Sequence, residues 1–154
     1  MKTTLRRMLG TAILAGGLAA GAAAKAETTL QFYFPVAVGG PITKIIDGMV
    51  ADFEKDNPAI KVKPIYAGSY QDTITKVLTA IKGGDVPQLS VILSPDMYTL
   101  FDADAIVPWD QFIAETDRAW INGFFPAFML NSRSSGTTWS IPFHRSTIVL
   151  YWNK

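Results

Sequence analysis

Apolar and polar positions form blocks along the chain that predict strands and helices in turn. A short apolar run at Leu30–Phe34 predicts a buried strand. From Pro41 onward, apolar residues recur at steps of three and four, which places them on one face of a helix that ends at Asn57-Pro58. We expect this stripe to face the core. Its members are Ile42, Ile45, Ile46, Met49, Val50 and Phe53.

The next blocks repeat the same order. Ile60–Tyr66 alternates like a half-exposed strand, and its Pro64 favours a sheet edge or a bulge. A second amphipathic helix follows and ends at Gly83-Gly84, and Leu89–Leu93 predicts the next strand. Shorter helical pieces are expected at Met97–Asp102, Trp109–Ala114 and Phe124–Leu130.

This order of strands and helices predicts an α/β fold with a parallel or mixed sheet flanked by helices. Ligands of such sheets bind at the carboxyl ends of the strands. The loops expected there are Pro35–Gly40, Gly68–Tyr70 and Ser94–Asp96.

The last apolar blocks enclose a polar loop. Trp139–Phe143 and Thr147–Trp152 are rich in aromatic and β-branched residues, so we expect both to be buried, extended segments. Between them lie His144, Arg145 and Ser146. Loops held in this way often carry ligand contacts.

The first 26 residues have the pattern of a secretory signal peptide. Basic residues precede an apolar stretch from Met8 to Ala24, and Ala24-Lys25-Ala26 predicts cleavage between Ala26 and Glu27. The chain has no cysteine, so a lipid anchor and disulfides are not expected. We expect a soluble periplasmic protein rather than one retained by a membrane anchor.

Charge and composition exclude several kinds of partner and chemistry. Of the 14 Lys and Arg, four lie in residues 1–26, which leaves 10 against 13 Asp and Glu and a net charge of about −3. No basic stripe suits a nucleic acid or an anionic membrane. With one histidine, no cysteine and no nucleophile motif, we expect no metal site, no cofactor and no enzymatic activity.

Three segments carry a resemblance to a known family. They read G-S-Y at Gly68–Tyr70, G-D-V-P at Gly84–Pro87 and P-F-H-R-S-T-I-V-L-Y-W-N-K at Pro142–Lys154. Together they resemble the family 1 extracellular solute-binding proteins, the receptors of bacterial ABC importers. Within that family the chain is most similar to the sn-glycerol-3-phosphate-binding branch.

The resemblance implies a periplasmic-binding-protein-like N-terminal lobe at residues 27–154, truncated before a second lobe that would close over the ligand. It implies a monomeric receptor, without a nucleic-acid partner, that delivers a polyol phosphate or a related sugar to membrane permease subunits. The alternatives are a receptor of the same family for a neutral oligosaccharide and, third, a secreted hydrolase.

The resemblance also assigns ligand contacts. Tyr70 matches a family tyrosine that faces the ligand, and the alternative is a half-buried surface tyrosine. Ser146 matches a serine that contacts a phosphate or a hydroxyl, and the alternative is a serine that satisfies a strand end.

Three further candidates depart from the pattern of the branch. Ser94 stands where the branch has a glutamate that receives ligand hydroxyls, and His144 and Arg145 stand where it has small polar residues. Because a guanidinium suits phosphate, sulfate or carboxylate, we expect Arg145 to favour an anion. The alternatives are that Arg145 points to solvent or pairs with an acid. For His144, the simpler interpretation is an ordinary polar loop residue.

Overall fold

The computed structural model describes residues 27–35, 41–113, 117–146 and 148–153. Its elements are β1 (Thr28–Pro35), α1 (Ile42–Asp56), β2 (Ile60–Gly68), α2 (Tyr70–Gly83), β3 (Leu89–Ser90), α3 (Asp96–Asp102), η1 (Trp109–Gln111), α4 (Arg118–Asn122), α5 (Pro126–Met129), η3 (Leu130–Ser132), β4 (Arg133–Ser134) and β5 (Thr137–Thr138). The predicted signal peptide, residues 1–26, lies outside the described residues. None of the described helices is both long and apolar enough to cross a bilayer.

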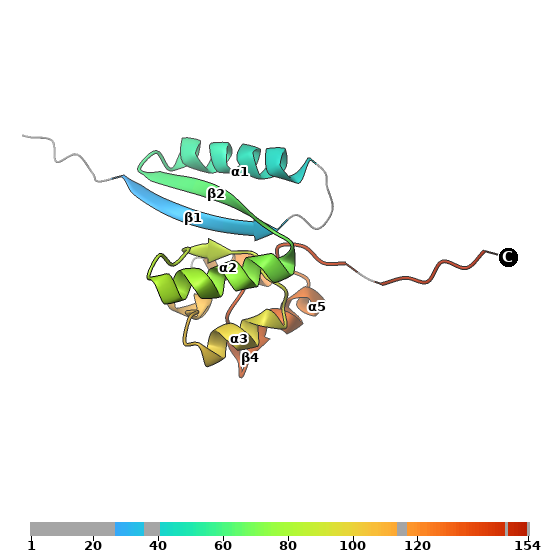
Figure 1. Cartoon of the computed structure of the whole chain (residues 1–154). Coiled ribbons are helices and arrows are strands. Elements are labelled where there is room, and N and C mark those ends of the chain that lie inside the picture. Colours follow the sequence, from blue (N-terminus) through green and yellow to red (C-terminus); the bar gives the residue numbers. More distant parts are fainter. Residues whose placement is uncertain (1–26, 36–40, 114–116, 147, 154) are drawn as a thin grey trace, which may run out of the picture.

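The main sheet has three parallel strands in the order β2-β1-β3, which confirms the predicted alternation of strands and helices. α1 covers one face of β1 and β2, and α2 lies on the other side of the sheet, with α3 and α5 beyond it (Figure 1). Parallel strands are joined by crossovers, so their carboxyl ends share one edge of the sheet. That edge is where the predicted site residues should gather.

The core lies on the side of the sheet that α2 covers. Ile74 and Val77 of α2 pack with Leu100 of α3, and all three side chains are buried. Partly buried residues packed against this cluster are Tyr33, Leu78, Ile81, Ile92, Ala105 and Ile106. The apolar periodicity of the second predicted helix therefore identified a core face correctly.

The apolar stripe of α1 is only partly covered, so the prediction that it faces the core needs correction. Ile46 is buried, but Ile45, Met49 and Phe53 expose 48%, 57% and 40% of their surface. β2, on which α1 packs, is the last strand on its side of the sheet. No further described strand lies beyond it to cover the rest of the stripe.

Glu54 of α1 closes the outer edge of β2. Its carboxylate accepts the Val62 amide at 2.8 Å and the Lys61 ammonium at 3.0 Å. Pro64, on the same strand, has no N–H to offer. The expected edge position of Pro64 is confirmed, and the register shift lies elsewhere, after Phe34. The Val62 amide first, and then Lys61, lower the pKa of the Glu54 carboxyl.

We expect Glu54→Gln to lower the free energy of unfolding at pH 7 by an amount that shrinks in acid. A carboxyl whose pKa is lowered in the folded state stabilises it above the unfolded pKa, and this stabilisation is lost as pH falls through the folded pKa. Glutamine can still accept the Val62 amide but carries no charge. Urea denaturation of both proteins between pH 7 and pH 3 measures the difference. A gap that stays constant with pH would contradict the charge contribution.

Several predicted elements are shorter than expected. β3 has two residues, although the Val91 amide still donates to the Tyr33 carbonyl at 2.9 Å. The helix predicted over Trp109–Ala114 is a single 3-10 turn, and its last residue lies outside the described residues. The helix predicted over Phe124–Leu130 is one turn of α-helix, and α4 before it was not predicted. Such single turns are too short for apolar periodicity to identify.

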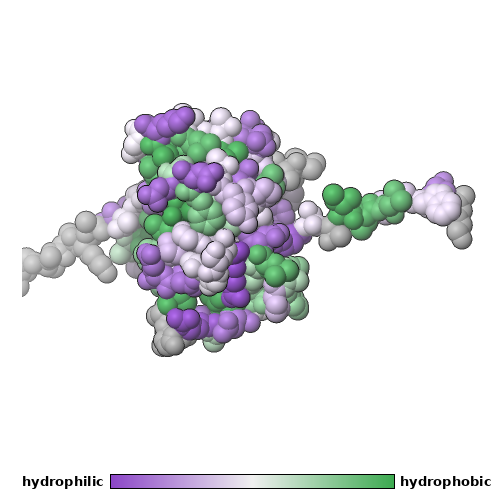
Figure 2. Space-filling view, turned by 90° about the horizontal axis from the view of Figure 1, so that it is seen from below, coloured by the Kyte–Doolittle hydropathy of each residue, from purple (hydrophilic) through white to green (hydrophobic). Residues whose placement is uncertain are grey.

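The last stretch does not form two buried, extended segments. β4 and β5 instead pair through Ser135-Gly136, whose φ values of 52° and 81° suit a two-residue hairpin. After them, Trp139–Phe143 is irregular. The described residues Ile148–Trp152 are exposed and run away from the body of the molecule (Figure 1), as an apolar extension (Figure 2). Strand propensity could not place this segment, because a strand needs a partner and no described strand pairs with it.

Candidate functional site

The turn between β2 and α2 fixes the first side of the candidate site. Gly68 ends the strand with φ of 102°, a conformation that residues with a side chain rarely adopt. Ser69 then caps α2: its hydroxyl accepts the Asp72 amide at 3.1 Å, and the Asp72 carboxylate accepts the Ser69 amide at 2.9 Å. The Ser69 hydroxyl and then its amide lower the pKa of Asp72. This turn sets the position of Tyr70, the first residue of α2.

Tyr70 meets His144 across the carboxyl end of the sheet. The Tyr70 hydroxyl lies 2.8 Å from His144 Nε2, and the two ring centroids are 6.0 Å apart. Partial burial raises the pKa of Tyr70, so its hydroxyl stays protonated at neutral pH. Tyr70 is half-buried, and His144 is exposed but takes part in a specific contact. No sequence motif indicated this contact, which is compatible both with a ligand residue and with an ordinary polar loop residue at His144.

Arg145 ties the polar loop to two other segments. Its Nη1 donates to Ser94 Oγ at 2.9 Å, and its Nη2 donates to the Phe128 carbonyl at 2.6 Å. A third, long contact joins Nη2 to Ser132 Oγ at 3.5 Å. The guanidinium therefore neither points freely into solvent nor pairs with an acid. All three partners are neutral oxygens, and no described carboxylate lies within ion-pair distance of it.

The structure thus brings four of the five predicted site residues into hydrogen-bonded contact with one another at the carboxyl edge of the sheet. They form two linked pairs, Tyr70 with His144 and Ser94 with Arg145, joined by the adjacency of His144 and Arg145 in the chain. Ser146, next in the loop, is exposed, and within the described residues its side chain has no partner. A ligand contact of Ser146 remains a prediction.

Two partners of Arg145 were not predicted. Phe128 contributes only its carbonyl, which every residue type carries, so the sequence contains no signal for it. Ser132 is the last residue of η3, and only the structure shows that it is buried. Non-local main-chain acceptors of this kind cannot be identified from local motifs.

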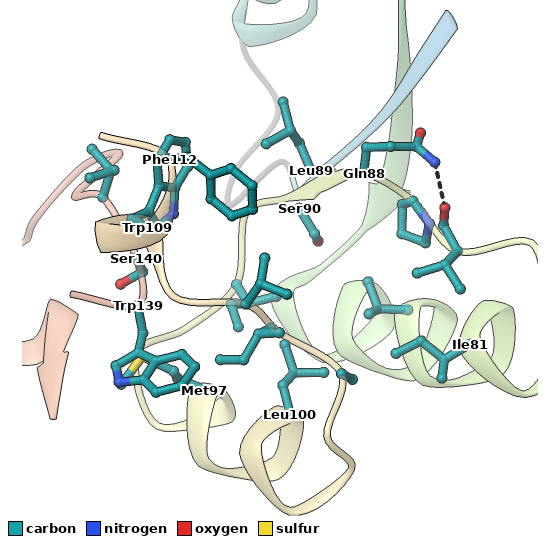
Figure 3. A pocket seen from close by; sticks show the side chains of 18 residues that line it. Ile81, Gln88, Leu89, Ser90, Met97, Leu100, Trp109, Phe112, Trp139 and Ser140 are labelled. Carbon is teal, nitrogen blue, oxygen red and sulfur yellow. Dashed lines mark hydrogen bonds between the residues drawn. The ribbon is translucent and has the colours of Figure 1, made fainter. Parts of the chain in front are cut away.

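An apolar pocket, separate from this polar cluster, lies beside the outer edge of β3 (Figure 3). It encloses 590 Å³ and is lined mainly by apolar side chains of α2, β3, α3 and η1 and of the chain near Trp139. Met97, Leu100 and Trp139 lie together at one end of it (Figure 3). None of the five predicted site residues lines it. We interpret it as a part of the core that no described element covers, rather than as the site of a polar solute.

The polar cluster offers groups that can bind a polar solute. It offers hydroxyls, an imidazole and a guanidinium, which together recognise hydroxyl groups and anions. The imidazole of His144 contacts the Tyr70 hydroxyl and not a serine, so these groups are not arranged as a serine nucleophile with a histidine base. Among the described residues, no group of three or more potential metal ligands comes together.

Comparisons with known proteins agree with this interpretation. Residues 48–154 match the family described as bacterial extracellular solute-binding protein. The sn-glycerol-3-phosphate-binding periplasmic protein UgpB of Escherichia coli O1:K1 / APEC is 31% identical over 144 residues, which cover 92% of this chain and 32% of UgpB. UgpB of Escherichia coli strain K12 is 30% identical over the same shares. The chain spans about a third of the length of these relatives.

Solved structures show the same fold. The sugar-binding protein MalE from Xanthomonas citri matches with a TM-score of 0.63 and 23% identity, over 75% of this chain and 28% of that protein. The mannotriose complex of CpMnBP1 matches with a TM-score of 0.59 and 22% identity, over 72% of this chain and 27% of that one. At such identities the likeness concerns the fold alone, and it confirms the predicted α/β lobe.

Proposed function

Because the chain belongs to the bacterial extracellular solute-binding proteins, as its sequence resemblance predicted, we propose that it captures a small polyol phosphate for an ABC importer. The solute would lie against the carboxyl edge of the sheet, between Tyr70 and Arg145. In this proposal residues 27–154 are one of two lobes, and the second lobe closes over the solute. Export to the periplasm and delivery to permease subunits belong to the same proposal.

The proposal that the solute is an anion rests on the charge of Arg145. A guanidinium has five N–H donors, and the protein contacts of Arg145 account for three of them. Its partners are neutral, so its positive charge is not compensated by a described carboxylate. A partly buried charge without a counterion is costly, and an anionic solute would supply the missing charge. Phosphate or sulfate oxygens fit the planar fork.

The polyol part rests on neighbouring hydroxyls. Tyr70 and Ser94 present hydroxyl oxygens on either side of the loop, and Ser146 adds an exposed one. Hydroxyls of this kind exchange hydrogen bonds with sugar or glycerol hydroxyls. The similarity to the named glycerol-3-phosphate-binding protein supports the same class of solute.

A neutral oligosaccharide is the second candidate. Its support is that both terminal nitrogens of Arg145 already bind protein oxygens, so part of the fork is used before any solute arrives. In that case Arg145 would only hold the loop in place. The two candidates differ in whether a charged solute is bound in preference to a neutral one.

Titration of isotope-labelled chain with glycerol 3-phosphate, glycerol and maltose tests the proposal. We expect glycerol 3-phosphate at millimolar concentration to shift the NMR signals of Tyr70, Ser94 and Arg145, and glycerol, the neutral match, to leave them almost unchanged. Calorimetry at micromolar concentration should show no heat, because the contacts of a second lobe are absent. Saturable shifts with maltose but not with glycerol 3-phosphate would favour the neutral candidate instead.

A further inference from the structure

The form of the contact between Tyr70 and His144 depends on which ring nitrogens of His144 carry a proton. When His144 is neutral with Nε2 unprotonated, the Tyr70 hydroxyl donates to Nε2 across the 2.8 Å contact. The phenol oxygen can then only accept from a third group. When His144 is protonated, Nε2 donates to the phenol oxygen, and the hydroxyl proton is free to point elsewhere. The same two side chains therefore present either an acceptor or a donor.

We propose that protonation of His144 turns the Tyr70 hydroxyl into a donor toward the solute, so that an anionic solute binds more tightly at lower pH. This inference rests on the proposed function and adds a specificity-determining role for His144. A sulfate ester accepts hydrogen bonds and does not donate them. The neutral pair offers it the Tyr70 proton only in the tautomer that carries a proton on Nε2, whereas protonation of His144 frees the Tyr70 proton in every molecule. The positive charge on the imidazole would act in the same direction.

The charged groups near His144 leave that charge uncompensated. The described contacts of its ring are the Tyr70 hydroxyl and the Phe143 ring, whose centroid is 5.7 Å away. On the loop side, Arg145 directs its guanidinium to Ser94 and Phe128. On the α2 side, Asp72 is engaged with Ser69. No described carboxylate lies within ion-pair distance of the imidazole, so protonation adds net positive charge beside the site.

The test is an NMR titration of the chain with solute at pH 5.5 and at pH 8, on either side of physiological pH. The probe is glycerol 3-sulfate, because its charge is constant over this range, whereas that of a phosphate monoester is not. One gained hydrogen bond predicts an affinity about two- to tenfold higher at pH 5.5. The proton-binding constant of His144, followed by its imidazole nitrogen signals, must rise by the same factor when the solute is bound.

Two variants separate the donor exchange from a general effect of charge. His144→Gln keeps a polar side chain that does not titrate, and its affinity should be the same at both pH values. Tyr70→Phe keeps the titrating imidazole but loses the hydroxyl proton, and most of the pH dependence should disappear. A pH dependence that persists undiminished in Tyr70→Phe would overturn the inference and leave only charge attraction.

The failure of this inference is distinguishable from that of the proposed function. If glycerol 3-sulfate binds equally at both pH values, the solute proposal stands and the role of His144 is refuted. If neither glycerol 3-sulfate nor glycerol 3-phosphate shifts the site signals at either pH, both are refuted.

Discussion

Replacing Gly68 by alanine is expected to lower the free energy of unfolding by about 1 to 3 kcal/mol, the cost of holding a residue with a side chain in an unfavourable backbone conformation. Gly68 has φ of 102°, and a Cβ there would lie 2.7 Å from Asp72 Oδ2 and 2.9 Å from Asp72 Cβ. Asp72 would have to move, and the cap of α2 would weaken, which adds about 0.5 to 2 kcal/mol. The position of Tyr70 depends on the same turn, so solute binding should weaken as well.

Urea denaturation measures this effect, and Gly48→Ala is its matched control. Gly48 lies inside α1 with nothing within 4 Å of an added Cβ, so alanine should stabilise the protein by about 0.5 to 1 kcal/mol. Opposite signs for the two glycines would show that the turn, and not glycine in general, causes the loss. If Gly68→Ala were as stable as the unchanged protein, the turn would not be constrained as described.

Arg145→Ala is expected to have two effects. It removes the hydrogen bonds that join the polar loop to Ser94 and Phe128, and bonds to a charged group contribute about 1.5 to 3 kcal/mol to stability. If Arg145 also holds the anion, affinity for glycerol 3-phosphate should fall about ten- to a hundredfold, with affinity for a neutral solute almost unchanged. Denaturation measures the first effect, and NMR titration measures the second.

Two further variants distinguish holding the loop from binding the anion. Arg145→Lys keeps the charge but lacks the planar fork that reaches both acceptors, so stability should fall while part of the anion affinity remains. Arg133→Ala, at an exposed arginine in β4, should change neither quantity. Unchanged anion affinity in Arg145→Ala would reject the phosphate assignment and leave only the role in holding the loop.

Patterns that depend on neighbours in the chain predicted the fold well. The apolar periodicity before Gly83-Gly84 predicted α2 and its end, because a helix and its carboxyl-terminal cap are made from adjacent residues. Its apolar face packs on the core for the same reason. The turn that orients Tyr70 was likewise visible as a short motif, and the structure supplies its physical basis.

Features that depend on distant partners were predicted poorly. Ile148–Trp152 has strong strand propensity but no described partner, and the stripe of α1 extends past the last strand that could cover it. In the candidate site, Arg145 and Ser94 were both predicted as ligand contacts, but their mutual hydrogen bond, which spans 51 residues of chain, was not predicted. The sequence could suggest which groups would act, and only the fold shows which of them meet.

The two edges of the sheet differ in their free backbone N–H groups, so a further strand would add more readily at one edge than at the other. On β2, Glu54 occupies the outward Val62 amide and Pro64 has none, so an incoming strand would find no regular row of donors. On β3 no described side chain blocks the outer edge, which opens beside the 590 Å³ apolar pocket. Of the two described edges, the one next to β3 is therefore the one that suits an added strand. A molecule with one blocked edge can pair with a neighbouring molecule through its open edge but not through its blocked one. This restricts edge-to-edge polymerisation.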